Sequence, residues 1–287
     1  MFDPVLTKDP TAVEFEVQSA YLSMFPGGDR LFVPRVFGWM LDCFSGSYRD
    51  YQAVDARYHD FEHTLQGTLC MARLLRGRHS VGAEPRLTQR MVELGILAIL
   101  LHDTGYLKRR DDVDGTGAKY TVIHVTRSAD FAAQLLGEKG FRDGEVLAVQ
   151  NMIHCTGVDA DLTVIPFQSE MEKVTGFALG TADLLGQMAA EDYVDKLPIL
   201  YSEFAEAMRY SKGETHFIGA FSSASDLMRK TPGFWEKFVL VKLDKDFGGV
   251  HRFLNDSSSG RNEYLERVEA NMERLKTKLM AETAPSR

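Results

Sequence analysis

Apolar residues recur along this chain every three or four positions, a spacing that places them on one face of an α-helix. The segment 60–75 shows the pattern clearly, with apolar residues at positions 61, 65, 69, 72 and 75. Start and stop signals agree with it, since the first such segment follows Asp9-Pro10-Thr11 and stops at Pro26-Gly27-Gly28. The sequence predicts helices over residues 13–24, 34–44, 60–75, 87–101, 121–136 (with Thr121 as the cap), 144–153, 170–188, 202–208, 234–243 and 262–280.

No stretch alternates apolar and polar residues well enough to predict a sheet. Loops rich in Gly, Asp, Arg and Pro are predicted over residues 76–85 and 105–119. The last helix carries an apolar stripe, which either packs on the same domain or binds a second copy of the chain. We therefore predict an all-α fold with one helical domain over residues 1–287. A homodimer formed through the stripe of the last helix is the alternative use of that stripe.

Charge and composition narrow the possible partners and location. The net charge of −8 makes nucleic acid polymers and acidic membrane surfaces poor partners. The longest apolar run, residues 94–101, is too short to span a bilayer, and residues 1–4 lack the features of a secretory signal. Three scattered cysteines, Cys43, Cys70 and Cys155, suggest neither a disulfide framework nor a thiolate metal site. These features favour a cytoplasmic protein.

A pair of histidines and a His-Asp dipeptide are the first candidates for metal binding or catalysis. His59 and His63 are four residues apart, so on a helix they share a face one turn apart, although exposed histidines at helix starts are common. The pair His102-Asp103 follows directly on the apolar run 94–101. Because buried charge is costly unless it is paired or bound to a metal, this placement favours a ligand role over a simple helix-end cap.

Three further polar residues lie in apolar surroundings: His124 near a helix start, His154 at the end of an apolar segment, and Asp183 within the helix 170–188. Each alone is most often a satisfied polar residue of a core. Taken together with the histidines above, one shared metal centre would account for nearly all of them.

The order His…His-Asp…His…His…Asp on separate helices resembles the HD superfamily of metal-dependent phosphohydrolases, over about residues 58–188. The likeness is to its two-metal branch, which includes the HD-GYP phosphodiesterases. The resemblance implies an HD-like core over about residues 55–190 with helical extensions at both ends, including additional C-terminal helices. It also implies two divalent ions (Mn, Fe, Mg or Ni), one held by His63, His102, Asp103 and Asp183. Asp103 would bridge to a second ion on His124 and His154.

The segment Tyr58-His59-Asp60-x-x-His63 is also similar to the motif that opens cyclic-nucleotide phosphodiesterase catalytic domains. In that family the first histidine gives a proton to the leaving oxygen, which would make His59 a catalytic acid alongside Asp103. Three sites in the sequence, two single residues and one tripeptide, differ from the related families. Asp60 stands where Asn is usual, Tyr106 stands where HD-GYP proteins carry Lys, and Cys155-Thr156-Gly157 replaces the Gly-Tyr-Pro signature. Cyclic-dinucleotide activity is therefore not carried over.

The resulting prediction is a phosphodiesterase or phosphatase that acts on a nucleotide or another small phosphate ester by two-metal activation of water. Lys108, Arg109 and Arg127 are candidates to hold a phosphate, with solvated side chains as the alternative. The loop 105–119 and the segment 158–170 are expected at the pocket mouth. A di-iron oxygenase that resembles inositol oxygenase would use nearly the same ligands. A nucleotide-sensing module without catalysis is a third class, which would not need all six ligands.

Overall fold

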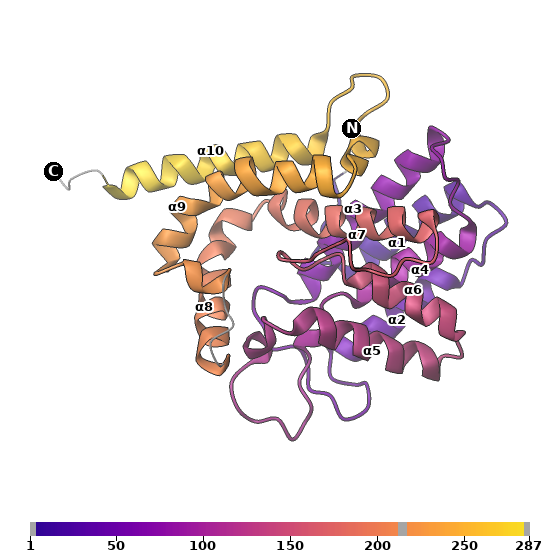
Figure 1. The fold of residues 1–287 in the computed structure, drawn as a ribbon, viewed down its shortest axis with the longest axis horizontal. Helices are drawn as coiled ribbons and strands as arrows, with labels where there is room; N and C mark the ends of the chain where they lie inside the picture. Colours follow the sequence, from indigo (N-terminus) through magenta and orange to yellow (C-terminus); the bar gives the residue numbers. More distant parts are fainter. Residues whose placement is uncertain (1–3, 212–216, 284–287) are drawn as a thin grey trace.

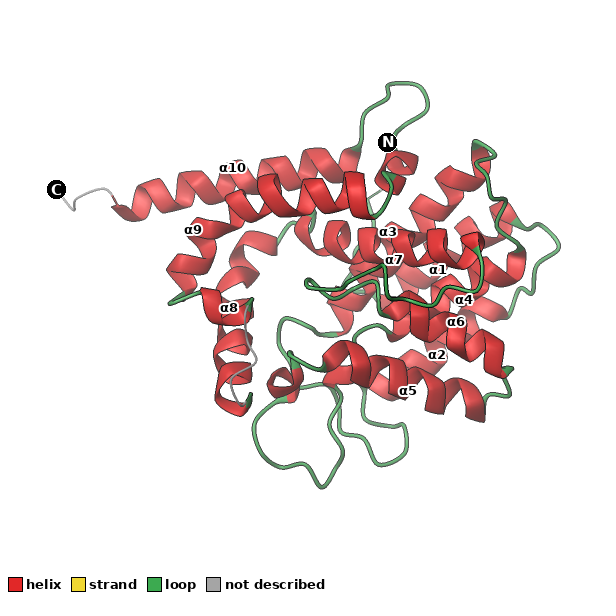
Figure 2. Cartoon of the chain, in the orientation of Figure 1, coloured by secondary structure: helices red, strands yellow, loops and turns green. Residues whose placement is uncertain are grey.

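The computed structural model describes residues 4–211 and 217–283 of the chain. Residues 1–3, on which the expectation of no secretory signal partly rests, lie outside them. The described part contains ten α-helices and no strand, so the all-α prediction is confirmed (Figures 1 and 2). The helices are α1 Pro10–Met24, α2 Phe32–Phe44, α3 Phe61–Ser80, α4 Gln89–Leu101, α5 His124–Glu138, α6 Asp143–Ile153, α7 Glu170–Met188, α8 Tyr193–Tyr210, α9 Ala224–Phe234 and α10 Glu263–Thr283.

Side-chain caps determine where several of these helices begin. Asp60 directly precedes α3, and its side chain accepts a hydrogen bond from the backbone N–H of His63 at 2.9 Å. It therefore caps the N-terminus of the helix. Thr88 caps α4 and Ser169 caps α7 in the same way. Each oxygen satisfies a backbone donor that the first helical turn leaves without a partner.

Several helices differ from the prediction in their bounds or in their type. α3 continues through residues 76–80, because Gly77 does not break the helix but lets the carbonyl of Phe253 approach closely. α5 begins at His124 rather than at Thr121, whose hydroxyl donates to the carbonyl of Ala118 instead of accepting as a cap. α8 is longer than predicted, and α9 was missed because its Pro232 interrupts the helical pattern. The predicted helix 234–243 consists mainly of π-helical turns at 235–239 and 242–246.

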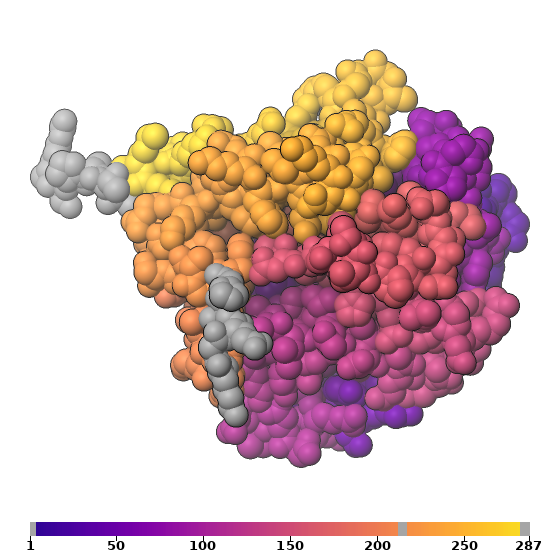
Figure 3. All heavy atoms as spheres, in the orientation of Figure 1, coloured from indigo at the N-terminus to yellow at the C-terminus, as the bar shows by residue number. Residues whose placement is uncertain are grey.

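α3 and α7 form the most extensive helix pair and lie at the centre of the bundle, with α4 and α6 beside them (Figure 1). α4 is buried continuously from Val92 to Leu101. α10 runs across one end against α9, α7 and α8, and its Val268, Met272 and Leu275 are buried there. The apolar stripe of the last helix thus packs on its own chain. In the space-filling view the orange and yellow C-terminal residues lie along the upper and left parts of the face shown, next to the red and magenta residues (Figure 3).

None of the helices in the described ranges combines the length and the apolar character that crossing a membrane requires.

Gly186 lies where α7 approaches α3 closely, whereas Gly38 of α2 faces open space, so we expect opposite effects when each is replaced by alanine. A Cβ on Gly186 of α7 would lie 2.8 Å from the backbone of Gln66 and Gly67 in α3, so Gly186→Ala should cost about 1–3 kcal/mol of unfolding free energy. A Cβ on Gly38 of α2 would meet nothing within 4 Å, so Gly38→Ala should gain about 0.5–1 kcal/mol. Urea unfolding of both variants measures this, and equal effects would contradict the backbone contact.

Candidate metal centre

Two helices and the end of a third bring two imidazoles and two carboxylates together in the core. His63 comes from the first turn of α3, His102 and Asp103 follow α4, and Asp183 comes from the middle of α7. Nε2 of His63 lies 3.1 Å from Oδ2 of Asp103 and 3.4 Å from Oδ1 of Asp183. Nε2 of His102 lies 3.4 Å from the same two oxygens. All four side chains are buried or nearly so, and we call them the four-residue cluster.

The polar atoms of the cluster fit a divalent transition-metal ion. Nε2 of His102 and Oδ2 of Asp103 are fully buried and have no hydrogen-bond partner among the described residues. Nδ1 of His102 is 2.7 Å from the carbonyl oxygen of Ile99 and donates to it, which leaves the Nε2 lone pair directed at the carboxylates. Two imidazole nitrogens with two carboxylate oxygens are a ligand set that such ions accept. The cluster can therefore hold a metal.

The protein also holds the second carboxylate of the cluster in place. Nε2 of Gln187 donates to Oδ1 of Asp183 at 3.2 Å, and the hydroxyl of Tyr58 donates to the Gln187 carbonyl oxygen at 2.8 Å. Groups that hydrogen-bond a ligand orient it and tune its affinity for the ion. Asp183 is thus positioned from α7 itself and from the segment before α3.

Electrostatics within the metal-free cluster are dominated by imidazole–carboxylate attraction. Burial alone would lower the pKa of His63, but Asp103 and Asp183 outweigh it and raise that pKa to about 10. Burial alone would raise the pKa of both carboxyls, yet His102 and His63 lower each pKa well below its usual range. A metal that binds there takes the place of a proton on His63.

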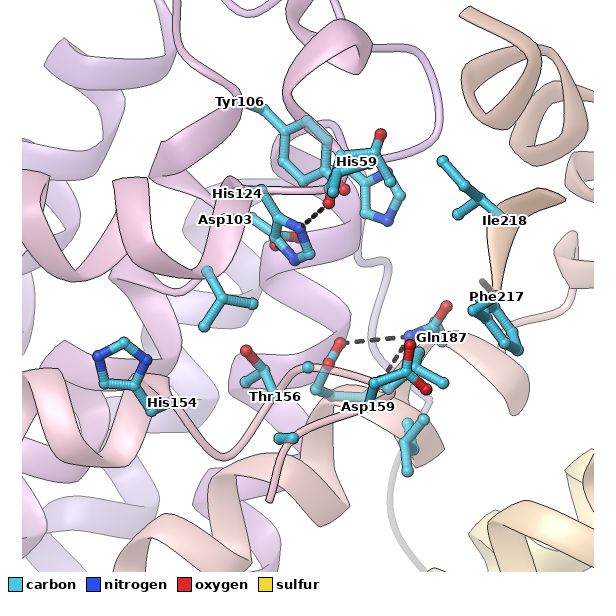
Figure 4. A pocket seen from close by; sticks show the side chains of 18 of the residues that line it. His59, Asp103, Tyr106, His124, His154, Thr156, Asp159, Gln187, Phe217 and Ile218 are labelled. Carbon is cyan, nitrogen blue, oxygen red and sulfur yellow. Dashed lines mark hydrogen bonds and ion pairs between the residues drawn. The ribbon is translucent and has the colours of Figure 1, made fainter. Parts of the chain in front are cut away.

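His124 and His154 are the two histidines expected at a second ion, and they are placed differently. Nε2 of His124 lies 3.9 Å from Oδ1 of Asp103, and its Nδ1 is 2.6 Å from the carbonyl oxygen of Thr121. His154 caps the C-terminus of α6 and lines the same cavity, but lies apart from the other histidines (Figure 4). Among the described residues it makes no ion pair with Asp103 or Asp183. The structure therefore brings His124 to the cluster and does not bring His154 there.

His59 has a carboxylate partner that sequence reasoning missed. Its Nδ1 is 2.6 Å from Oε2 of Glu203 on α8, and the other carboxylate oxygen accepts from the backbone N–H groups of Arg57 and Tyr58. The His59 ring stacks on Tyr106, with centroids 4.4 Å apart and planes 10° apart. Glu203 lies 144 residues away in sequence and on a helix without any recognised motif, so no local signal identified it.

The three basic residues expected to contact phosphate serve the protein's own loops. Nζ of Lys108 is buried and donates to Asp55 at 3.1 Å and to the carbonyl of Gly115. Arg127 donates to the carbonyls of Gly105 and Leu107, and Arg109 lies over the ring of Tyr51. None of the three lines the cavity at the cluster. The structure thus does not place these side chains where a bound phosphate would need them.

A cavity of about 630 Å³ opens onto the cluster and onto His59 (Figure 4). The segment 158–166 contributes to its lining, as the sequence predicted for the pocket mouth. Of the loop 105–119, only Tyr106 reaches it. The remaining wall comes from the start of α5, from α7, and from the C-terminal region around α8 and α9.

The fold and the cluster define this chain as an all-helical protein with a buried histidine–aspartate centre that opens into a cavity. The chain belongs to the Npun_R2479-like family, whose family model matches residues 43–275. The matched range includes the cluster, His59, His124 and Glu203. No curated protein matches the chain.

The positions of the histidines predict which of them holds metal. His63→Ala removes a nitrogen within 3.4 Å of both carboxylates, so the metal content of the purified variant should fall below half that of wild type. His154→Ala is the matched control and should leave the metal content unchanged, because His154 lies outside the cluster. Elemental analysis of both variants is the measurement. Metal loss in His154→Ala would show that it is a ligand.

Removing the metal should make stability depend on pH. In the metal-free fold the pKa of His63 is about 10, against roughly 6.5 in an unfolded chain. The folded state then holds an extra proton between these values, so the unfolding free energy falls as pH rises through that window. The metal-loaded protein lacks this loss, because its imidazoles are already neutral. Urea unfolding at about pH 7 and about pH 9, with chelator and with Mn²⁺, compares the two slopes; equal slopes would contradict the assignment.

Proposed function

We propose that this protein is a metal-dependent hydrolase of small phosphoric esters, built like the HD superfamily. The observation that carries the proposal is the juxtaposition of the four-residue cluster with the His59–Glu203 pair at one cavity. A buried ligand set that opens beside a proton-transfer group is what metal-assisted hydrolysis requires. The small ester as substrate, in place of a nucleic acid, and a cytoplasmic location belong to the same proposal.

Each residue of the site then has a definite role. His63, His102, Asp103 and Asp183 would hold one divalent ion, and Asp103 with His124 offers a position for a second. A bound divalent ion supplies Lewis acidity toward the phosphoryl group and lowers the pKa of water. The HD-type order of these residues along the chain, together with their convergence from different helices, supports the likeness to that superfamily.

His59 is the proposed general acid. Its Nδ1 is engaged by Glu203, so Nε2 is the nitrogen that gives a proton to the leaving oxygen. Glu203 accepts from two backbone N–H groups and from Nδ1, so it acts as a positioning residue that holds the His59 ring in place. Tyr106 stacks on both His59 and His124 and fixes the planes of the two rings.

The metal and oxygen requirements of the reaction distinguish a hydrolase from a di-iron oxygenase. Metal-free protein refilled with Mn²⁺ under argon should hydrolyse at least one phosphate ester, and Asp183→Ala should abolish this because it removes a carboxylate of the cluster. His154→Ala serves as the folded control. Activity only in the iron form and only in air would overturn the hydrolase proposal in favour of the di-iron oxygenase.

Comparing esters with poor and good leaving groups distinguishes a general acid from a metal ligand. His59→Ala should keep its metal and lose about 10²–10⁴-fold in kcat on alkyl esters, and much less on nitrophenyl esters, which need little protonation. Glu203→Gln should show the same selectivity for alkyl esters with a smaller loss, because the ring keeps a hydrogen-bond partner. Equal losses on both kinds of ester would show that His59 is structural or a ligand.

A further inference from the structure

The cavity wall, as far as the structure describes it, contains neither a lysine nor an arginine. The nearby cations point elsewhere: Nζ of Lys242 donates to the carbonyl of Val158 from behind the wall, and Lys108 and Arg127 are engaged as described above. Among the described residues of the wall, a second anionic group on a ligand would therefore find no lysine or arginine as a charge partner.

Two carboxylates line the wall outside the cluster. Asp159 and Asp161 line the cavity from the segment after α6, and both are exposed. Within a few ångströms of a bound ligand they would repel further negative charge, since like charges weaken binding and the repulsion is screened only partly at this range.

The rest of the wall is apolar and in part aromatic. The C-terminal region supplies one side, where the rings of Phe204 and Phe217 lie 6.2 Å apart and those of Phe217 and Phe234 lie 5.6 Å apart. Leu184 of α7 and Val164 line the cavity as well. A cavity of this size and lining suits an organic group that gains by leaving water.

We infer that the natural ester carries a bulky apolar group, aryl or alkyl, and no second anionic group. This inference rests on the proposed function for the phosphoryl part and on the wall for the organic part. It separates the substrate from nucleoside di- and triphosphates, whose additional phosphates would face Asp159 and Asp161. It also assigns a role to the C-terminal region, which builds the apolar side of the site.

The binding preference can be measured without turnover. Alkylphosphonates have a carbon–phosphorus bond and are not hydrolysed, so calorimetric titration of the Mn²⁺-loaded protein reports affinity alone. Each methylene buried in the cavity should raise affinity up to about fourfold, and hexylphosphonate should bind at least about tenfold more tightly than methylphosphonate. 3-Phosphonopropionate, which adds a carboxylate, should bind no better than methylphosphonate. Equal affinities, tighter binding of the carboxylate, or no binding of any of the three would overturn the inference.

One pair of surface variants tests the wall itself. Val164 lines the cavity and is 73% exposed, so Val164→Lys places a cation at the wall without disturbing the core. It should reduce the preference for hexylphosphonate over 3-phosphonopropionate at least fivefold. Val81→Lys is the matched control, 66% exposed at the end of α3 and outside the cavity, and should leave the preference within twofold of wild type. An unchanged preference in Val164→Lys would overturn the inference.

The kinetic arm distinguishes failure of this inference from failure of the proposed function. If hexylphosphonate is preferred but no phosphate ester is hydrolysed with any divalent metal, the apolar site stands and the hydrolase proposal fails. If nitrophenyl esters are hydrolysed with no gain from a hexyl or phenyl group on phosphorus, the hydrolase proposal stands and the apolar substrate class is wrong.

Discussion

The attraction between two buried carboxylates and two buried imidazoles is the interaction on which the rest of this structure depends. Asp103 and Asp183 sit where an unpaired charge would cost several kcal/mol, so the fold must deliver His63 and His102 to them from separate helices. That requirement explains the near contact of α3 and α7, where Gly186 lets the two backbones approach. It also explains why the core packs tightly around a polar centre.

The sequence predicted much of this centre because its histidines and aspartates lie in, or directly after, helices with strong apolar periodicity. His102-Asp103 was identified by the apolar run before it, and Asp183 by the apolar helix around it. Nine of the ten α-helices were recognised, at least in part, for the same reason. Their ends were less accurate, since a cap such as Thr121 is decided by whether its hydroxyl finds a backbone donor or a backbone acceptor in three dimensions.

Other features could not be predicted, because they depend on contacts between distant segments. His154 has the same apolar context as His124, yet helix α6 carries it away from Asp103 while the start of α5 brings His124 close. Lys108, Arg109 and Arg127 flank the expected site in sequence, but buried carbonyls, Asp55 and an aromatic ring engage them. Glu203 is polar and unremarkable in sequence, and only the packing of α8 against the segment before α3 gives it a partner.

The C-terminal region is where this chain adds to the arrangement that the HD resemblance describes. The resemblance covers about residues 58–188 and includes the proposed ligands, whereas Glu203, Phe204, Phe217 and Phe234 lie beyond it. These residues supply the partner of the proposed acid and the aromatic side of the cavity. A metal cluster alone does not distinguish among esters, because it contacts only the phosphoryl group that all of them share. For the proposed hydrolase, selectivity would therefore come from the wall, and the C-terminal region builds one side of that wall, which is in part aromatic.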